Sequence, residues 1–124
     1  MKNNGFTLIE LLAVIAILGI LATITVPTIV GLINNSKEST LDEQKNTIVD
    51  AAKRWGTDNF RKLPTTSCDV SVDFLQKEGY ISSEKDVIDP TTDEKMTGCV
   101  RITFENSNNQ YKYNYVNTCG TSCE

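Results

Sequence analysis

The chain has 124 residues, a net charge of −4 and no histidine. The absence of histidine excludes Ser-His-Asp and Cys-His catalysis and every histidine-ligated metal centre. The acidic balance argues against a broad nucleic-acid-binding surface, which needs clustered lysine and arginine, so no direct nucleic-acid binding is expected. The length allows one domain plus a separate N-terminal segment.

The first predicted element is an apolar helix near the N-terminus. No charged side chain occurs from Leu11 to Ser36, a stretch longer than the roughly 20 residues that cross a ~30 Å hydrocarbon core. A secretory signal peptide has a shorter apolar core and a small-residue cleavage site after it. Val26-Pro27-Thr28 offers no such site, so we predict a retained transmembrane helix. Lys2 precedes it and should keep the leader cytoplasmic, which sends the rest of the chain outward.

One carboxylate, Glu10, lies at the start of this helix. A charged group in a membrane segment costs on the order of a few kcal/mol and by default indicates a function. The alternative is that Glu10 stays hydrated at the membrane edge.

The helix is predicted to continue past Pro27 to about Asn59 as an amphipathic helix. Leu41, Ile48 and Trp55 recur every seven residues, with Val49 and Ala52 beside them, so one stripe should face a core.

A sheet and a short helix are predicted after the long helix. The short helix begins after Ser71 as its N-cap and stops at Gly79. Two alternating segments, Cys99–Glu105 and Gln110–Val116, predict an antiparallel hairpin, with a third strand placed near Asp86–Ile88. The fold class is α+β: a long N-terminal helix, its first half transmembrane, packed against a small antiparallel sheet.

The four cysteines lie in the second half of the chain, at Cys68, Cys99, Cys119 and Cys123. Together with an export-type segment, an even count predicts two disulfides in an oxidising compartment, with zinc as the less favoured alternative. We predict Cys68–Cys99 and Cys119–Cys123, because only Gly120-Thr121-Ser122 separates the last two. The competing pairing joins Cys68 to the tail.

Two clusters allow other interpretations. The acidic residues could bind calcium, but they lack EF-hand spacing, so a solvated loop is favoured and no metal or other cofactor is predicted. The tyrosines could form a stacking or adhesive platform, although cross-strand packing is the ordinary explanation. These clusters are Asp86, Asp89, Asp93 and Glu94, and Tyr111, Tyr113 and Tyr115.

The stretch from Lys2 to Glu10, KNNGFTLIE, followed by an apolar helix, resembles the N-terminus of type IV prepilins and pseudopilins. The resemblance covers about the first 30 residues. A second segment, FLQKEGYI (residues 74–81), is similar to a stretch of competence pseudopilins and some Gram-positive pilins.

The resemblance implies specific roles for several residues. A prepilin peptidase would cleave after Gly5, and the new terminus at Phe6 would be N-methylated. Glu10 would pair with the new amino group, within one subunit or between neighbours, and so select one axial stagger. Gly19 and Pro27 would let the helix loosen during assembly, unless they reflect only the tolerance of membrane helices for these residues.

These roles divide the chain into a leader (1–5), a transmembrane assembly helix (6–34) and a globular head (35–124). The implied function is a non-enzymatic subunit of a type IV pilus-like filament, serving adhesion, twitching motility or DNA uptake. Its partners would be copies of itself, minor pilins, the prepilin peptidase and the inner-membrane assembly machinery. It would reside in the cytoplasmic membrane before assembly and on the cell surface afterwards. The alternatives are a pseudopilin of a type II secretion or competence system, and a single-pass membrane-anchored surface binding domain.

Overall fold

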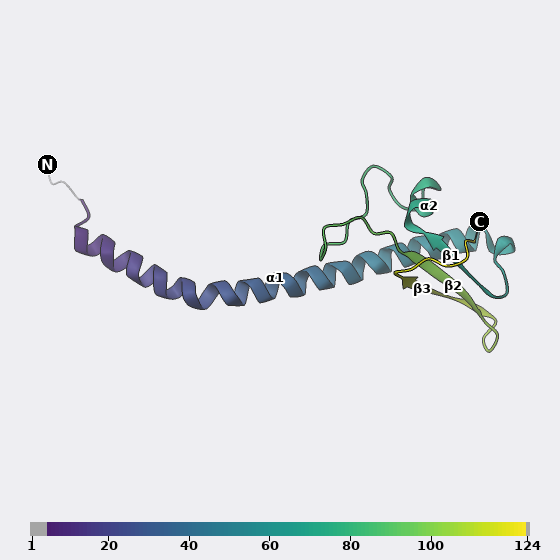
Figure 1. Cartoon of the computed structure of the whole chain (residues 1–124), viewed down its shortest axis with the longest axis horizontal. Helices are drawn as coiled ribbons and strands as arrows, with labels where there is room; N and C mark the ends of the chain where they lie inside the picture. The colour runs from purple at the N-terminus through teal and green to yellow at the C-terminus, as the bar shows by residue number, and fades with distance from the viewer. Residues whose placement is uncertain (1–4, 124) are drawn as a thin grey trace. The chain divides into compact units, whose positions relative to one another are not determined.

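The computed structural model describes residues 5–123, which divide into one unit reaching to Ser36 and another beginning at Lys37. Helix α1 (Leu8–Asp58) runs from the first unit into the second (Figure 1), which confirms the helix predicted between Thr7 and about Asn59. Of the predicted leader, only Gly5 lies within the described residues.

The first unit is the apolar part of α1, and every one of its described residues is exposed. By length and composition, α1 is able to cross a membrane. Threonine hydroxyls donate to backbone carbonyls about one turn earlier, from Thr23 to Ile20 at 2.7 Å and from Thr28 to Ile24 at 3.3 Å. These bonds flank Pro27, which removes one backbone donor from the helix. Such hydroxyl bonds are one way in which a membrane helix tolerates proline.

The second unit contains a three-stranded antiparallel sheet in the order β1-β2-β3. Strands β2 (Cys99–Glu105) and β3 (Gln110–Val116) confirm the predicted hairpin. The third strand is β1 (Ser67–Ser71), so the prediction of a strand near Asp86–Ile88 is wrong. Ile88 forms only an isolated bridge to Lys95 within its own connection, whereas β1 pairs with β2 over five residues.

The sheet packs against the C-terminal part of α1 (Figure 1). The buried helix side chains Ile48, Ala52 and Trp55 confirm the predicted stripe. They meet Val100 and Ile102 of β2, and all five residues are at most 3% exposed. Burial of these side chains is the main favourable contribution to the head's stability.

A short helix, α2 (Val72–Lys77), covers the same core. The Ser71 hydroxyl accepts a hydrogen bond from the backbone N–H of Phe74 at 3.0 Å, which confirms the predicted N-cap. Gly79 follows the helix with φ +84°, the left-handed conformation that ends helices and favours glycine. The Phe74 ring meets the indole of Trp55 edge-on at 5.6 Å and so fixes α2 on α1.

The three tyrosines of β3 pack inward, as the ordinary interpretation predicted. The Tyr111 hydroxyl donates to the Pro64 carbonyl at 3.1 Å, in the connection that follows the 3₁₀ helix η1 (Phe60–Lys62). The Tyr113 ring fills the space over Gly56 of α1: a Cβ added there would overlap the Tyr113 hydroxyl oxygen and lie 3.1 Å from Cζ. Gly56 therefore lets β3 approach the helix closely.

Candidate functional site

The Gly5–Phe6 bond lies in a non-helical lead-in of three residues before α1. The Phe6 side chain is 88% exposed, so the bond is open to a protease. A Cβ added at Gly5 would meet nothing within 4 Å, and its backbone φ is not in the left-handed region. Among residues 5–123, neither packing nor backbone conformation requires glycine at this position. Cleavage after Gly5 stays a prediction.

Thr7 and Glu10 form a reciprocal pair at the start of α1. The Thr7 backbone N–H donates to Glu10 Oε2 at 3.1 Å, and the Glu10 N–H donates to Thr7 Oγ1 at 3.3 Å. This is the capping box, in which a threonine and a glutamate three residues later satisfy two unpaired donors of a helix N-terminus. The sequence prediction did not assign a role to Thr7, although the T-x-x-E spacing before an apolar run is the signature of this motif.

The capping box gives Glu10 a partner before any processing takes place. The carboxylate lies at the positive end of the helix dipole, which stabilises its charge. Cleavage after Gly5 would create an amino group at Phe6, directly before Thr7 and within one helical turn of Glu10. The same carboxylate could then exchange its backbone partner for an amine of its own or a neighbouring chain. This role of Glu10 remains a prediction.

Gly19 and Pro27 lie within a continuous α1. A Cβ added at Gly19 would meet nothing within 4 Å, so packing within the chain does not explain this glycine. The role of both residues in loosening the helix stays a prediction.

All four cysteines form disulfides, but the predicted connectivity is wrong. Cys68 pairs with Cys123, and Cys99 pairs with Cys119, with Cα atoms 4.9 and 5.4 Å apart. The reason is the path of residues 117–123 after β3. This tail returns past the first residue of β2, Cys99, and then runs beside β1 (Figure 1). The short spacer between Cys119 and Cys123 thus joins two strands rather than closing a ring.

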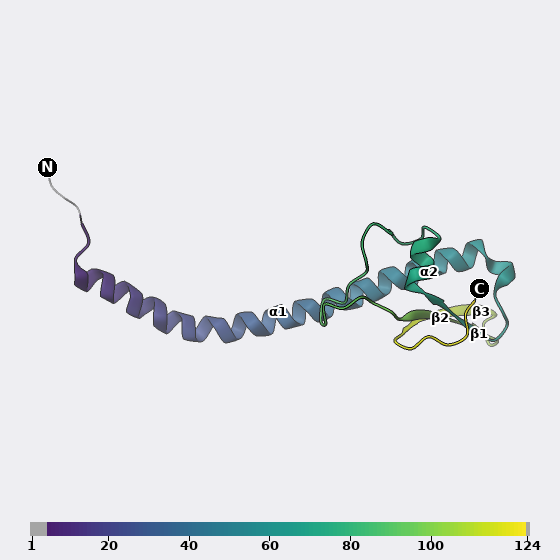
Figure 2. The same cartoon turned by 45° about the horizontal axis from the view of Figure 1, so that its top comes forward.

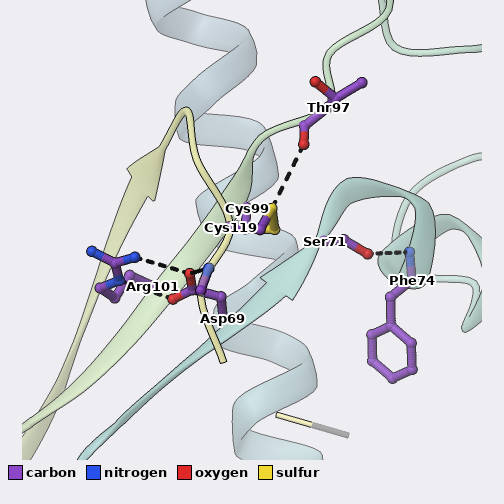
Figure 3. Close-up of a disulfide and its surroundings, with 8 residues drawn as sticks. Asp69, Ser71, Phe74, Thr97, Cys99, Arg101 and Cys119 are labelled. Carbon is purple, nitrogen blue, oxygen red and sulfur yellow. Dashed lines mark hydrogen bonds and ion pairs between the residues drawn. A yellow bond between two sulfur atoms is a disulfide. The ribbon is translucent and has the colours of Figure 1, made fainter. Parts of the chain in front are cut away.

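The tail is held by Asp69, a β1 residue that is only 4% exposed. Its carboxylate accepts two hydrogen bonds at 3.0 Å from the Arg101 guanidinium and another from the backbone N–H of Gly120 (Figure 3). Its backbone N–H donates to Thr121 O at 2.6 Å, and its carbonyl accepts from Cys123 N at 3.1 Å. The Arg101 hydrogen bonds hold the pKa of Asp69 below its ordinary value. Asp69 therefore fixes both the sheet and the tail beside it.

The acidic connection between α2 and β2 has internal partners. Lys95 pairs with Asp73 at 3.0 Å and Asp86 at 3.7 Å, and the Asp89 carboxylate accepts the Thr91 N–H at 2.8 Å. Among residues 5–123, no group of three or more acidic, histidine or cysteine side chains is arranged to hold a metal ion.

The comparisons with known proteins agree with this geometry. Residues 1–26 match the family model described as the prokaryotic N-terminal methylation motif. The chain is also similar to the type IV major pilin protein PilA of Myxococcus xanthus (strain DK1622), with 38% identity over 60 residues. That match covers 48% of this chain and 27% of the relative, so the chain spans about a quarter of the relative's length. No solved structure matches the chain significantly.

The motif, the apolar helix and the α+β head together define a type IV pilin-like protein. The N-terminal segment of the chain matches the methylation motif and is similar to a type IV major pilin. The cleavage and methylation motif thus confirms the resemblance drawn from KNNGFTLIE.

Proposed function

We propose that the chain is a structural subunit of a type IV pilus-like filament. In this proposal a prepilin peptidase removes residues 1–5, Phe6 becomes the N-methylated terminus, and the helix at 6–34 anchors the subunit in the cytoplasmic membrane. The head at 35–124 lies outside. The observation that carries the proposal is the apolar part of α1 up to Ser36, whose residues are all exposed and whose one charged side chain is Glu10.

The physical basis is an exchange of apolar surroundings. Lipid covers the apolar side chains while the subunit is stored in the membrane, and helices of other copies cover them in the filament. Because apolar contacts are nearly equivalent in the two settings, they cannot select one stagger between subunits. A carboxylate that must find an amine can select one, since any other register leaves it unpaired among apolar helices. Minor pilins and the inner-membrane assembly machinery would be the partners in this exchange.

Processing is tested by mass spectrometry of the mature chain. It should begin at Phe6 and carry one added methyl group, and Gly5→Leu should leave the full-length chain in the membrane. Gly31→Ala, a change at an exposed glycine within α1, should be processed normally. An intact N-terminus in the wild type would instead support a plain membrane anchor that carries a surface domain.

Assembly is tested by counting sheared filaments from cells that make Glu10 variants. Glu10→Leu should insert into the membrane at least as well as the wild type, because it removes a charge from an apolar segment, yet filaments should be lost. Glu10→Gln keeps an acceptor for the capping box and removes only the charge, so it should fail in the same way. Glu38→Gln, at an exposed carboxylate farther along α1, is the matched control. Normal filament numbers in Glu10→Gln would show that charge does not set the register.

A further inference from the structure

The head carries two segments of opposite charge. The acidic loop (residues 84–95) has five carboxylates and two lysines, a net charge of −3. The basic end (residues 53–62) has four cations and one carboxylate, a net charge of +3. The cations are Lys53, Arg54, Arg61 and Lys62, and all four are exposed.

The two segments lie apart within the head. Figures 1 and 2 both show the connection from α2 to β2 folding back along α1, away from the end of the helix. Asp89 and Glu94 line one hollow together with Tyr115, and the Lys45 ammonium lies over the Tyr115 ring at 5.5 Å from its centroid, so the loop lies near Lys45. The basic end surrounds Asp58, thirteen residues farther along α1. At 1.5 Å per residue, this separation is about 20 Å.

Charges of both segments are available to an outside partner. Within residues 5–123, none of the four cations of the basic end takes part in an ion pair, and neither do Asp93 and Glu94 of the acidic loop. The one carboxylate of the basic end, Asp58, accepts a hydrogen bond from the Tyr80 hydroxyl at 2.6 Å.

The two surfaces also differ in shape. The basic end has two adjoining hollows of about 410 and 390 Å³ that share Thr57 and Asp58. The acidic loop ends in an exposed turn at residues 91–94, held by the Asp89 N–H, which donates to Glu94 O at 2.8 Å. Met96 anchors the base of the loop in the core and is only 4% exposed. The acidic loop therefore offers an exposed turn with an internal hydrogen bond, and the basic end offers a hollowed surface.

We propose that the basic end of one head binds the acidic loop of the next copy in the filament. This contact joins different surfaces of identical subunits, so it can repeat from copy to copy along an open filament. The inference rests on the filament function proposed above. Because the charges are exposed, the contact should be sensitive to salt and should add to helix packing rather than replace it.

Charge reversal tests the contact in cells that assemble the full chain. Arg61→Glu with Lys62→Glu should lower the yield of sheared filaments on the order of fivefold, because like charges then face each other across the contact. Adding Asp93→Lys and Glu94→Lys to the same chain should restore the yield. Two reversals elsewhere, Lys37→Glu with Lys77→Glu at exposed lysines that form no ion pair, should leave the yield unchanged. Trp55 fluorescence confirms that each variant head is folded.

Zero-length carbodiimide cross-linking of intact filaments gives a direct readout. It should join Lys62 to Asp93 or Glu94, and the product should decline as salt rises. The two segments of one head lie too far apart for such a bond, so the peptide reports two copies. Three results would each overturn the contact. They are a normal filament yield in the chain with Arg61→Glu and Lys62→Glu, no recovery of yield when Asp93→Lys and Glu94→Lys are added, and the absence of the cross-linked peptide. Loss of filaments in Glu10→Leu alongside normal filaments in the charge-reversed chain would leave the proposed function standing without this contact.

Discussion

Replacing Gly56 by alanine sets two effects of similar size against each other. Alanine favours the helix over glycine by about 1 kcal/mol. Its methyl group, however, would overlap the Tyr113 hydroxyl oxygen and lie 3.1 and 3.2 Å from ring carbons Cζ and Cε1. Overpacking of this kind costs typically about 1–3 kcal/mol. We therefore expect a net loss of up to about 2 kcal/mol, which lowers the melting temperature by about 4–8 °C per kcal/mol for a domain of this size.

Tyr113→Phe supplies the test of this reasoning. Among the described residues the Tyr113 hydroxyl forms no hydrogen bond, so Tyr113→Phe alone should be nearly neutral. Combined with Gly56→Ala, it should recover most of the stability that Gly56→Ala loses. Unfolding of the full chain in neutral detergent can be followed by Trp55, the single tryptophan, which is 3% exposed in the core. Gly31→Ala, at a helix position with open space, is the control. A stable Gly56→Ala head, or a double variant that stays as unstable as the single one, would refute close packing at this position.

Three further outcomes follow from the tail and its contacts. Removing both cysteines of Cys68–Cys123 should destabilise the head by about 4 kcal/mol, and removing both cysteines of Cys99–Cys119 by about 3 kcal/mol. The first disulfide stabilises more because its cysteines are 55 residues apart in the sequence, whereas those of the second are 20 apart. Urea unfolding measures both losses. Asp69→Asn should cost about 1–3 kcal/mol at neutral pH, because it removes charge-assisted hydrogen bonds, and the same unfolding measurement checks it. Since the folded pKa of Asp69 is lowered, its stabilisation is fully present above the unfolded value of about 4 and is lost as pH falls through the folded value. The stability gap between wild type and variant should therefore close in acid, and a gap independent of pH would exclude the charge as its cause.

Elements with a clean periodicity were predictable from the sequence. The seven-residue stripe of α1 and the alternation in β2 and β3 each bury one face, so the pattern of apolar residues identifies both the element and its orientation. The cap at Ser71 and the stop at Gly79 were predictable for a local reason. A serine hydroxyl that accepts a backbone N–H and a glycine in the left-handed conformation define the ends of a helix without tertiary contacts.

Strand β1 and the disulfide pairing depend on partners distant in the sequence. The segment Ser67–Ser71 places Asp69 in the middle of a strand, where the residue type argues against one. Asp69 is tolerated there because Arg101 of β2 lies opposite it and the tail covers it. The cysteine connectivity follows from the same tail path, which no spacing in the sequence encodes. The capping role of Thr7, in contrast, was predictable from the spacing of Thr7 to Glu10 and was missed.

In the proposed function the head crosses a membrane, and the disulfide connectivity then has a consequence for the order of events as it emerges. Cys68 and Cys99 appear first, and neither native partner is present until residue 119 has followed. The earliest bond available to an oxidant is thus a non-native one, Cys68–Cys99. Escape from it requires a thiolate, of the tail or of an isomerase, to attack that bond, an exchange that takes seconds to hours depending on the oxidant and isomerase. The rate at which new subunits become competent would then depend on thiol exchange in the receiving compartment, and not only on translocation.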